Sequence, residues 1–169
     1  KYLINYWQKK NIHKTTKIYV TRKNASCRKI INESDLIDDL KSNNFQIVDT
    51  ENIEINEQIQ LFSSADIIIS PTGSALANIV FCKEGTKILE ITPRYNFDYE
   101  DTFKKRYSYM CDQLNLLYYS LEADPIKNDQ IDKNPEKYKF ISSNVSKNSN
   151  YYKNLLVKKN EFKKLIDKF

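Results

Sequence analysis

The sequence contains very few of the residues that shape glycine-rich and turn-rich folds. Two glycines, Gly73 and Gly85, and four prolines occur in 169 residues. Collagen-like chains, Gly/Ser linkers and turn-rich all-β domains need far more of both and are excluded. No apolar run approaches the roughly 18 residues that cross a bilayer. Hydrophobic residues nevertheless make up 40% of the chain, with twelve tyrosines among them, so the composition predicts a globular domain with a real core.

Cysteine and histidine are also scarce. The three cysteines, Cys27, Cys82 and Cys111, are odd in number and far apart, which favours reduced thiols in a reducing, cytoplasmic compartment over a disulfide framework. The single histidine, His13, leaves little for a zinc site or a catalytic triad. The sequence therefore predicts no metal site, and its catalytic base stays unassigned.

Positive charge is concentrated near the end of the chain. Residues 1–120 hold 16 Lys/Arg against 15 Asp/Glu, whereas residues 121–169 hold 11 against 7. A nearly neutral front part argues against nucleic acid as a partner, although a module built on the lysine-rich tail would reveal itself by steeply salt-dependent binding. Lysine outnumbers arginine 23 to 4. Each arginine is therefore informative as a bidentate clamp for phosphate or carboxylate: Arg22, Arg28, Arg94 and Arg106.

Strand-like and helix-like segments alternate along the first two thirds of the chain. This rhythm predicts an α/β fold, a Rossmann-like parallel sheet with helices on both faces. The expected strands are 17–21, 45–49, 66–70 and 86–91, with an edge strand at 116–120, and the expected helices are one capped by Asn32, one over 54–64, one over 75–81 and one over 103–114.

Four segments describe the expected domain organisation. Residues 1–14 are predicted to be a linker helix from a missing amino-terminal domain, and residues 15–121 the α/β domain. The polar stretch 122–150 is predicted to be a long loop. Residues 151–169 carry apolar side chains at helical spacing and are predicted to form a closing helix.

Ligands of open parallel sheets bind where the strands end. Three segments should meet there: 21–32, 49–58 and 70–78. Gly73 would let the backbone approach a ligand or adopt a positive φ, and Ser74 could cap a helix whose free N–H groups suit a phosphate. An ordinary tight strand-to-helix turn explains the same residues, and both interpretations stay open.

The first of these segments is unusually basic. Arg22, Lys23, Arg28 and Lys29 lie between a strand and the helix that Asn32 can cap. A clamp for a pyrophosphate explains this concentration of cations, and a solvated basic loop explains it as well. Glu33 suits the positive end of the helix dipole without any ligand.

Taken in order, these segments resemble glycosyltransferase family 61, which includes bacterial capsular polysaccharide enzymes. The resemblance covers about residues 17–92. It is carried by Tyr19-Val-Thr-Arg22, Arg28-Lys-Ile-Ile-Asn32-Glu33, Glu57-Gln58-Ile-Gln-Leu-Phe, Ala65-Asp-Ile-Ile-Ile-Ser-Pro71-Thr-Gly73-Ser-Ala-Leu-Ala-Asn78 and Ile88-Leu-Glu90-Ile.

The resemblance implies the carboxy-terminal, donor-binding half of a GT-B enzyme. Such an enzyme transfers a sugar, with inversion and without a metal or other cofactor, from a nucleotide sugar expected to be UDP-linked to a hydroxyl of a glycan acceptor in capsule or surface polysaccharide. Peripheral association with the inner face of the membrane stays open. A non-catalytic module that binds a nucleotide or a partner is the alternative.

The family's site residues carry over position by position. In this picture Arg22, Arg28, Gly73 and Ser74 hold the donor diphosphate. Thr72 stands where the family usually has histidine, which puts any proton-shuttling or charged role of that position in doubt. The remaining positions are expected to line the nucleotide, as Glu57, Gln58 and Asn78, or to order the loops, as Asn32, Glu33 and Glu90.

Overall fold

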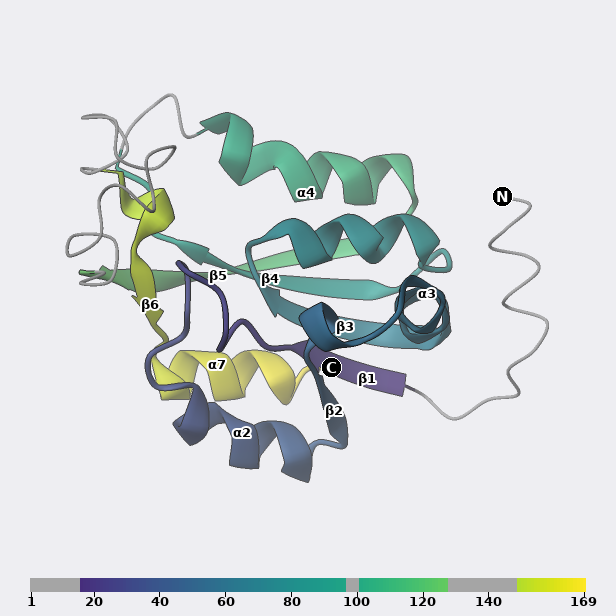
Figure 1. Cartoon of the computed structure of the whole chain (residues 1–169), viewed down its shortest axis with the longest axis horizontal. Helices are drawn as coiled ribbons and strands as arrows, with labels where there is room; N and C mark the ends of the chain where they lie inside the picture. The colour runs from purple at the N-terminus through teal and green to yellow at the C-terminus, as the bar shows by residue number, and fades with distance from the viewer. Residues whose placement is uncertain (1–15, 97–100, 128–148) are drawn as a thin grey trace.

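The computed structural model describes residues 16–96, 101–127 and 149–169. Its centre is a sheet with the strand order β2-β1-β3-β4-β5-β6 (Figure 1). All neighbouring strands run parallel except β6, which is antiparallel to β5. The predicted Rossmann-like α/β fold is confirmed. The strands are β1 Thr16–Val20, β2 Phe45–Val48, β3 Ala65–Pro71, β4 Lys87–Pro93, β5 Leu117–Ile126 and β6 Asn154–Leu156.

Helices cover both faces of the sheet. Figure 1 shows α2 and α7 on one face, and α3, the 3₁₀ helix η2 and α4 on the other. None of the described helices has the length and apolar character needed to cross a bilayer. The α-helices are α2 Glu33–Ser42, α3 Ile55–Ser64, α4 Asp101–Gln113 and α7 Lys159–Ile166, and the 3₁₀ helices are η1 Thr50–Asn52, η2 Ser74–Phe81 and η4 Asn150–Tyr152.

The strand β3 shows why the sheet needs both helical layers. Ile67 and Ile69 point into the core beneath α2 and α7, whereas Ile68 points into the core beneath α3, η2 and α4. Side chains alternate between the faces of a strand, so a continuous apolar run is stable only where both faces are covered. This run is almost completely buried, as its sequence predicts.

The sheet order places the topological switch point between β1 and β3. The chain leaves β1 for β2 on one side and then crosses to β3 on the other. The loops that follow these two strands, residues 21–32 and residues 72–73, therefore diverge from a common point at the carboxyl edge of the sheet. Parallel α/β proteins place their ligands at this point.

The predicted loop over 122–150 is wrong at its beginning. Strand β5 continues to Ile126, pairing with β4 as far as Ala123 and with β6 from Asp124 onward. It is consequently an inner strand, whereas 116–120 was expected at the edge. The predicted helix over 151–169 is also wrong in part, because η4 and β6 precede α7. Residues 128–148 and the expected linker helix over 1–14 lie outside the described residues.

Asn32 does not cap α2 with its side chain. Its amide nitrogen donates to the carbonyl of Val157 at 2.8 Å, and its amide oxygen accepts from the N–H of Val157 at 3.1 Å. The predicted cap is wrong because a distant segment competes for the same side chain. Asn32 instead joins the loop after β1 to the carboxy-terminal part of the chain.

Candidate anion-binding site

Arg22 and Gly73 meet at the switch point. A Cβ atom added to Gly73 would lie 2.8 Å from Cζ of Arg22 and closer still to one of its terminal nitrogens. The backbone of Gly73 is extended, with φ of 170°, so of the two roles predicted for Gly73 the left-handed backbone is wrong. Glycine is required here for space, because the guanidinium of Arg22 occupies the volume of a side chain. The loop after β1 and the turn after β3 are therefore in direct contact.

Arg28 lies close to Arg22 and makes two contacts with Tyr151. Its backbone has φ of 58°, in the left-handed region that costs a non-glycine residue energy. Its Nη1 donates to the carbonyl of Tyr151 at 3.4 Å, and its guanidinium lies 4.3 Å from the centre of the Tyr151 ring. Burial, followed by the charge of Arg28, lowers the pKa of Arg22. Two cations kept close together favour an anion between them.

Arg106, on α4, supplies a third guanidinium. It lies 4.4 Å from the centre of the Tyr107 ring. Burial opposes its charge, but Tyr107, a hydrogen bond with Tyr151 and the charge of Glu90 together raise its pKa. The hydroxyl of Tyr107 donates to the carbonyl of Gly73 at 2.5 Å, which joins α4 to the turn after β3. We refer to Arg22, Arg28 and Arg106 as the arginine cluster.

Glu90 is an acidic residue of this region and is completely buried on β4. Tyr118 donates to its Oε2 at 2.7 Å. Burial raises the pKa of Glu90, while Thr72, Tyr118, Arg106 and Arg28 act in the opposite direction. Thr72 is close enough to act on Glu90, but its Oγ1 makes no hydrogen bond of good geometry in the described residues. The buried carboxyl of Glu90 therefore lies near the guanidiniums of Arg106 and Arg28, while the charge of Glu51 acts on Arg22.

Several buried polar atoms around the arginine cluster make no hydrogen bond within the described part of the chain. A buried polar group without a partner costs about 1–3 kcal/mol, so native proteins seldom keep several together. Their presence at the switch point makes this the candidate site for a ligand with acceptor and donor groups. The atoms are Nε of Arg22, Nε of Arg28, Oγ1 of Thr72, Oε1 of Glu90 and the hydroxyl of Tyr95.

Glu33 supports the loop that carries Arg22 and Arg28. It accepts hydrogen bonds from the hydroxyl of Tyr19 at 2.7 Å and from the hydroxyl of Thr21 at 2.9 Å. Its carboxylate thereby ties the start of α2 to the end of β1. This placement is compatible with the loop-ordering role implied for Glu33, which stays a prediction.

The expected nucleotide-side residues divide into two groups. Asn78 donates to the side chain of Gln58 at 2.8 Å, and Gln58 donates to the carbonyl of Thr50 at 3.0 Å. These bonds join η2, α3 and the turn after β2. Glu57 is exposed on α3. Ser74, which was predicted to hold the diphosphate, is exposed at the start of η2. The predicted Ser74 cap is wrong, because no side chain caps η2.

Sequence reasoning did not place Arg106, Tyr95, Tyr107 or Tyr151 in the site. The signal for Arg106 was present, since it is one of four arginines in the chain. The tyrosines had none, because they lie on segments that meet the switch point only in three dimensions. In the described part of the chain, no group of three or more His, Cys, Asp or Glu could hold a metal ion.

The fold and the site together define a Rossmann-like α/β domain with a cluster of arginines at its switch point. The model of the family described as Glycosyltransferase 61 matches residues 1–89, more than half of the chain. The chain belongs to glycosyltransferase family 61, and its function is that of a glycosyltransferase domain. No curated protein is similar enough to the chain to serve as a relative.

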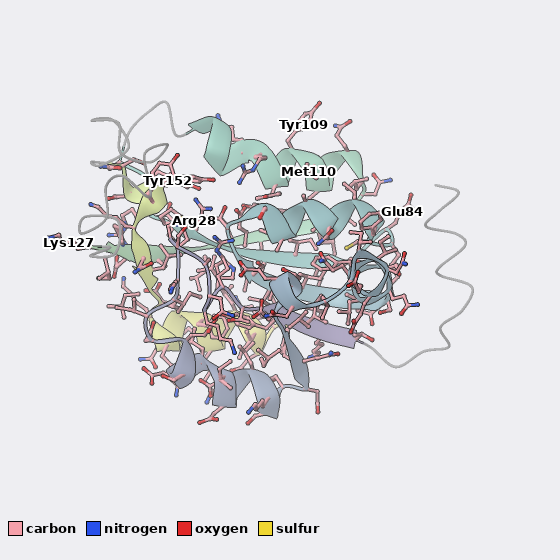
Figure 2. All side chains as sticks on the ribbon, viewed as in Figure 1. Arg28, Glu84, Tyr109, Met110, Lys127 and Tyr152 are labelled. Carbon is pink, nitrogen blue, oxygen red and sulfur yellow. The ribbon has the colours of Figure 1, made fainter. Side chains whose placement is uncertain are left out.

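The burial of Glu90 predicts a pH-dependent effect of its removal. Because burial raises its pKa, the folded state binds this proton more tightly than the unfolded chain does. Its contribution to stability is then present at low pH and is lost as pH rises through the folded pKa. Glu90→Gln should therefore gain stability relative to the unmodified chain as pH rises above about 4.5, the ordinary pKa of glutamate, as measured by thermal unfolding. Glu84→Gln serves as the control, because it removes an exposed carboxylate at the end of the molecule opposite Arg28 (Figure 2). If the stability difference between Glu90→Gln and the unmodified chain did not change with pH, the prediction would be wrong.

Proposed function

We propose that this chain is the donor-binding part of an inverting glycosyltransferase, and that the arginine cluster holds the diphosphate of a nucleotide sugar. The observation that carries the proposal is the convergence of three guanidiniums at the switch point. Two of them, those of Arg22 and Arg28, have buried Nε atoms that lack a hydrogen-bond partner in the described residues. Guanidinium groups match the paired oxygens of phosphate better than ammonium groups do.

The chemistry that this site supports is departure of a nucleoside diphosphate. An acceptor hydroxyl oxygen attacks the anomeric carbon, the bond from that carbon to the diphosphate oxygen breaks, and the hydroxyl proton passes to a base. Guanidiniums stabilise the charge that develops on the diphosphate, which supports a mechanism without a divalent metal. The base and the acceptor site are assigned to a further, amino-terminal domain of the same protein.

The biological setting follows from the family resemblance. We propose a UDP-linked donor, a glycan acceptor in capsule or surface polysaccharide, and a cytoplasmic site of action at or near the inner face of the membrane. The second candidate is a non-catalytic module that binds a nucleotide or a partner. Thr72 favours it, because this completely buried threonine replaces the histidine that the family usually has.

Calorimetric titration of the chain with UDP, UDP-sugars and GDP-sugars tests the proposal. We expect one site with a dissociation constant of about 1 μM to 1 mM, the range of ordinary Michaelis constants. Binding should weaken as salt is added, because the contact is largely ionic. If none of the nucleotides bound, the diphosphate site would be refuted and the partner-binding module favoured.

A further inference from the structure

The carboxy-terminal strap, which we define as residues 149–157, crosses the carboxyl edge of the sheet. It contains η4 and β6, seen at the left of Figure 1. The N–H of Leu155 donates to the carbonyl of Lys29 at 2.8 Å, and the N–H of Ile31 donates to the carbonyl of Leu155 at 2.9 Å. At its other end, the Asn150 side chain donates to the carbonyl of Arg94 at 2.7 Å. The strap is therefore attached on both sides of the arginine cluster.

Tyr151 is the residue of the strap that contacts this cluster. Its side chain is buried, and its ring face lies under Arg28 while its carbonyl accepts from the same guanidinium. Its side chain also forms a hydrogen bond with Arg106. Figure 2 shows Arg28 at the same end of the molecule as Tyr152, the neighbour whose ring packs edge-on against Tyr151 at 5.0 Å. One rigid side chain thus touches two guanidiniums from different segments.

We propose that Tyr151 is a positioning residue that sets the spacing of Arg28 and Arg106, so that the site selects a nucleoside diphosphate over a nucleoside monophosphate. This inference rests on the proposed function. The two cations repel each other, and each has a long flexible side chain that loses rotamer freedom when it is held. The Tyr151 ring attracts Arg28 through its face, and the hydroxyl holds Arg106 at the ring edge. Two guanidiniums at a fixed separation can each grip one phosphate, whereas a monophosphate uses only one of them.

Two variants separate the two contacts. Tyr151→Phe keeps the ring under Arg28 and removes the hydroxyl that holds Arg106, and Tyr151→Leu removes both. The affinities of UDP and UMP are measured for each variant by calorimetry. We expect the preference for UDP over UMP to fall about threefold in Tyr151→Phe and about tenfold in Tyr151→Leu. A change in the folded fraction lowers both affinities equally, so their ratio reports on the site alone.

Tyr119→Phe and Tyr119→Leu are the matched controls. Tyr119 lies on β5 and packs against Phe169 at 5.0 Å, away from the arginine cluster. Its variants should keep the UDP preference of the unmodified chain. A Tyr151→Leu variant with an unchanged preference would overturn the positioning role and leave the proposed function intact. An unmodified chain that binds neither UDP nor UMP would overturn both.

Discussion

Replacing Arg28 with alanine is expected to weaken UDP binding by about 100-fold. Hydrogen bonds to a charged group contribute about 1.5–3 kcal/mol, and the guanidinium can make two of them to one phosphate. The loss of about 3 kcal/mol corresponds to that factor. Arg28→Lys should recover only part of the affinity, since an ammonium group keeps the charge but lacks the planar fork. Calorimetry at constant ionic strength measures both variants.

Arg94→Ala is the control for a change in net charge alone. Arg94 is exposed over 56% of its side chain and pairs with Asp124 at 3.2 Å. Its removal takes away one positive charge near the same edge of the sheet but no group of the arginine cluster. We expect UDP affinity to change less than twofold, because exposed charges are screened by salt. If Arg94→Ala weakened binding as much as Arg28→Ala, the effect would be one of general charge, and the clamp assignment would be wrong.

Local sequence patterns were sufficient for most of the sheet. Strands β1 to β4 are short apolar segments between turn residues. Strand β3 is buried on both faces, as its continuous apolar run predicts, whereas β2 at the edge of the sheet keeps Gln46 exposed. Strand β5 beyond Ser120 could not be found in this way. Its last residues, Asp124–Ile126, pair with Asn154–Leu156, so their partner comes from beyond the polar segment 128–148. Strand pairing over such a distance leaves little trace in the local composition.

The sequence predicted which residues lie near one another in the candidate site, but not the contacts that tertiary packing creates between them. Strand ends and arginine scarcity indicated Arg22, Arg28 and Gly73 as neighbours, and the structure brings them together. Close approach of a ligand was one of the two roles predicted for Gly73, but the neighbour in that space is Arg22. A sequence shows that a side chain is absent but not which neighbour occupies its place. Asn32 and Ser74 fit the pattern of helix caps, yet the side chain of neither caps a helix. Asn32 binds Val157 instead, and Ser74 is exposed at the start of η2.

Gly73→Ala is expected to weaken UDP binding by about 30-fold while stability changes little. The added Cβ must displace the guanidinium of Arg22, which removes one charged donor from the site. The displaced group is the end of a flexible side chain, and the extended backbone at Gly73 suits alanine. The folded state therefore adapts at small cost, and the damage falls on the ligand. Calorimetric affinity and thermal unfolding of the same sample measure the two effects.

Gly85→Ala should show the reverse pattern. Gly85 has φ of 80°, and nothing lies within 4 Å of the place where its Cβ would stand. Alanine in this left-handed conformation costs about 1 kcal/mol or more, so the unfolding temperature should fall while UDP affinity stays unchanged. The two glycines would then carry separate functions, one making room for a ligand-binding arginine and one turning the chain into β4. If Gly73→Ala lowered stability and left affinity intact, Arg22 would be a structural residue of the loop, and the diphosphate would have to be held by Arg28 and Arg106 alone.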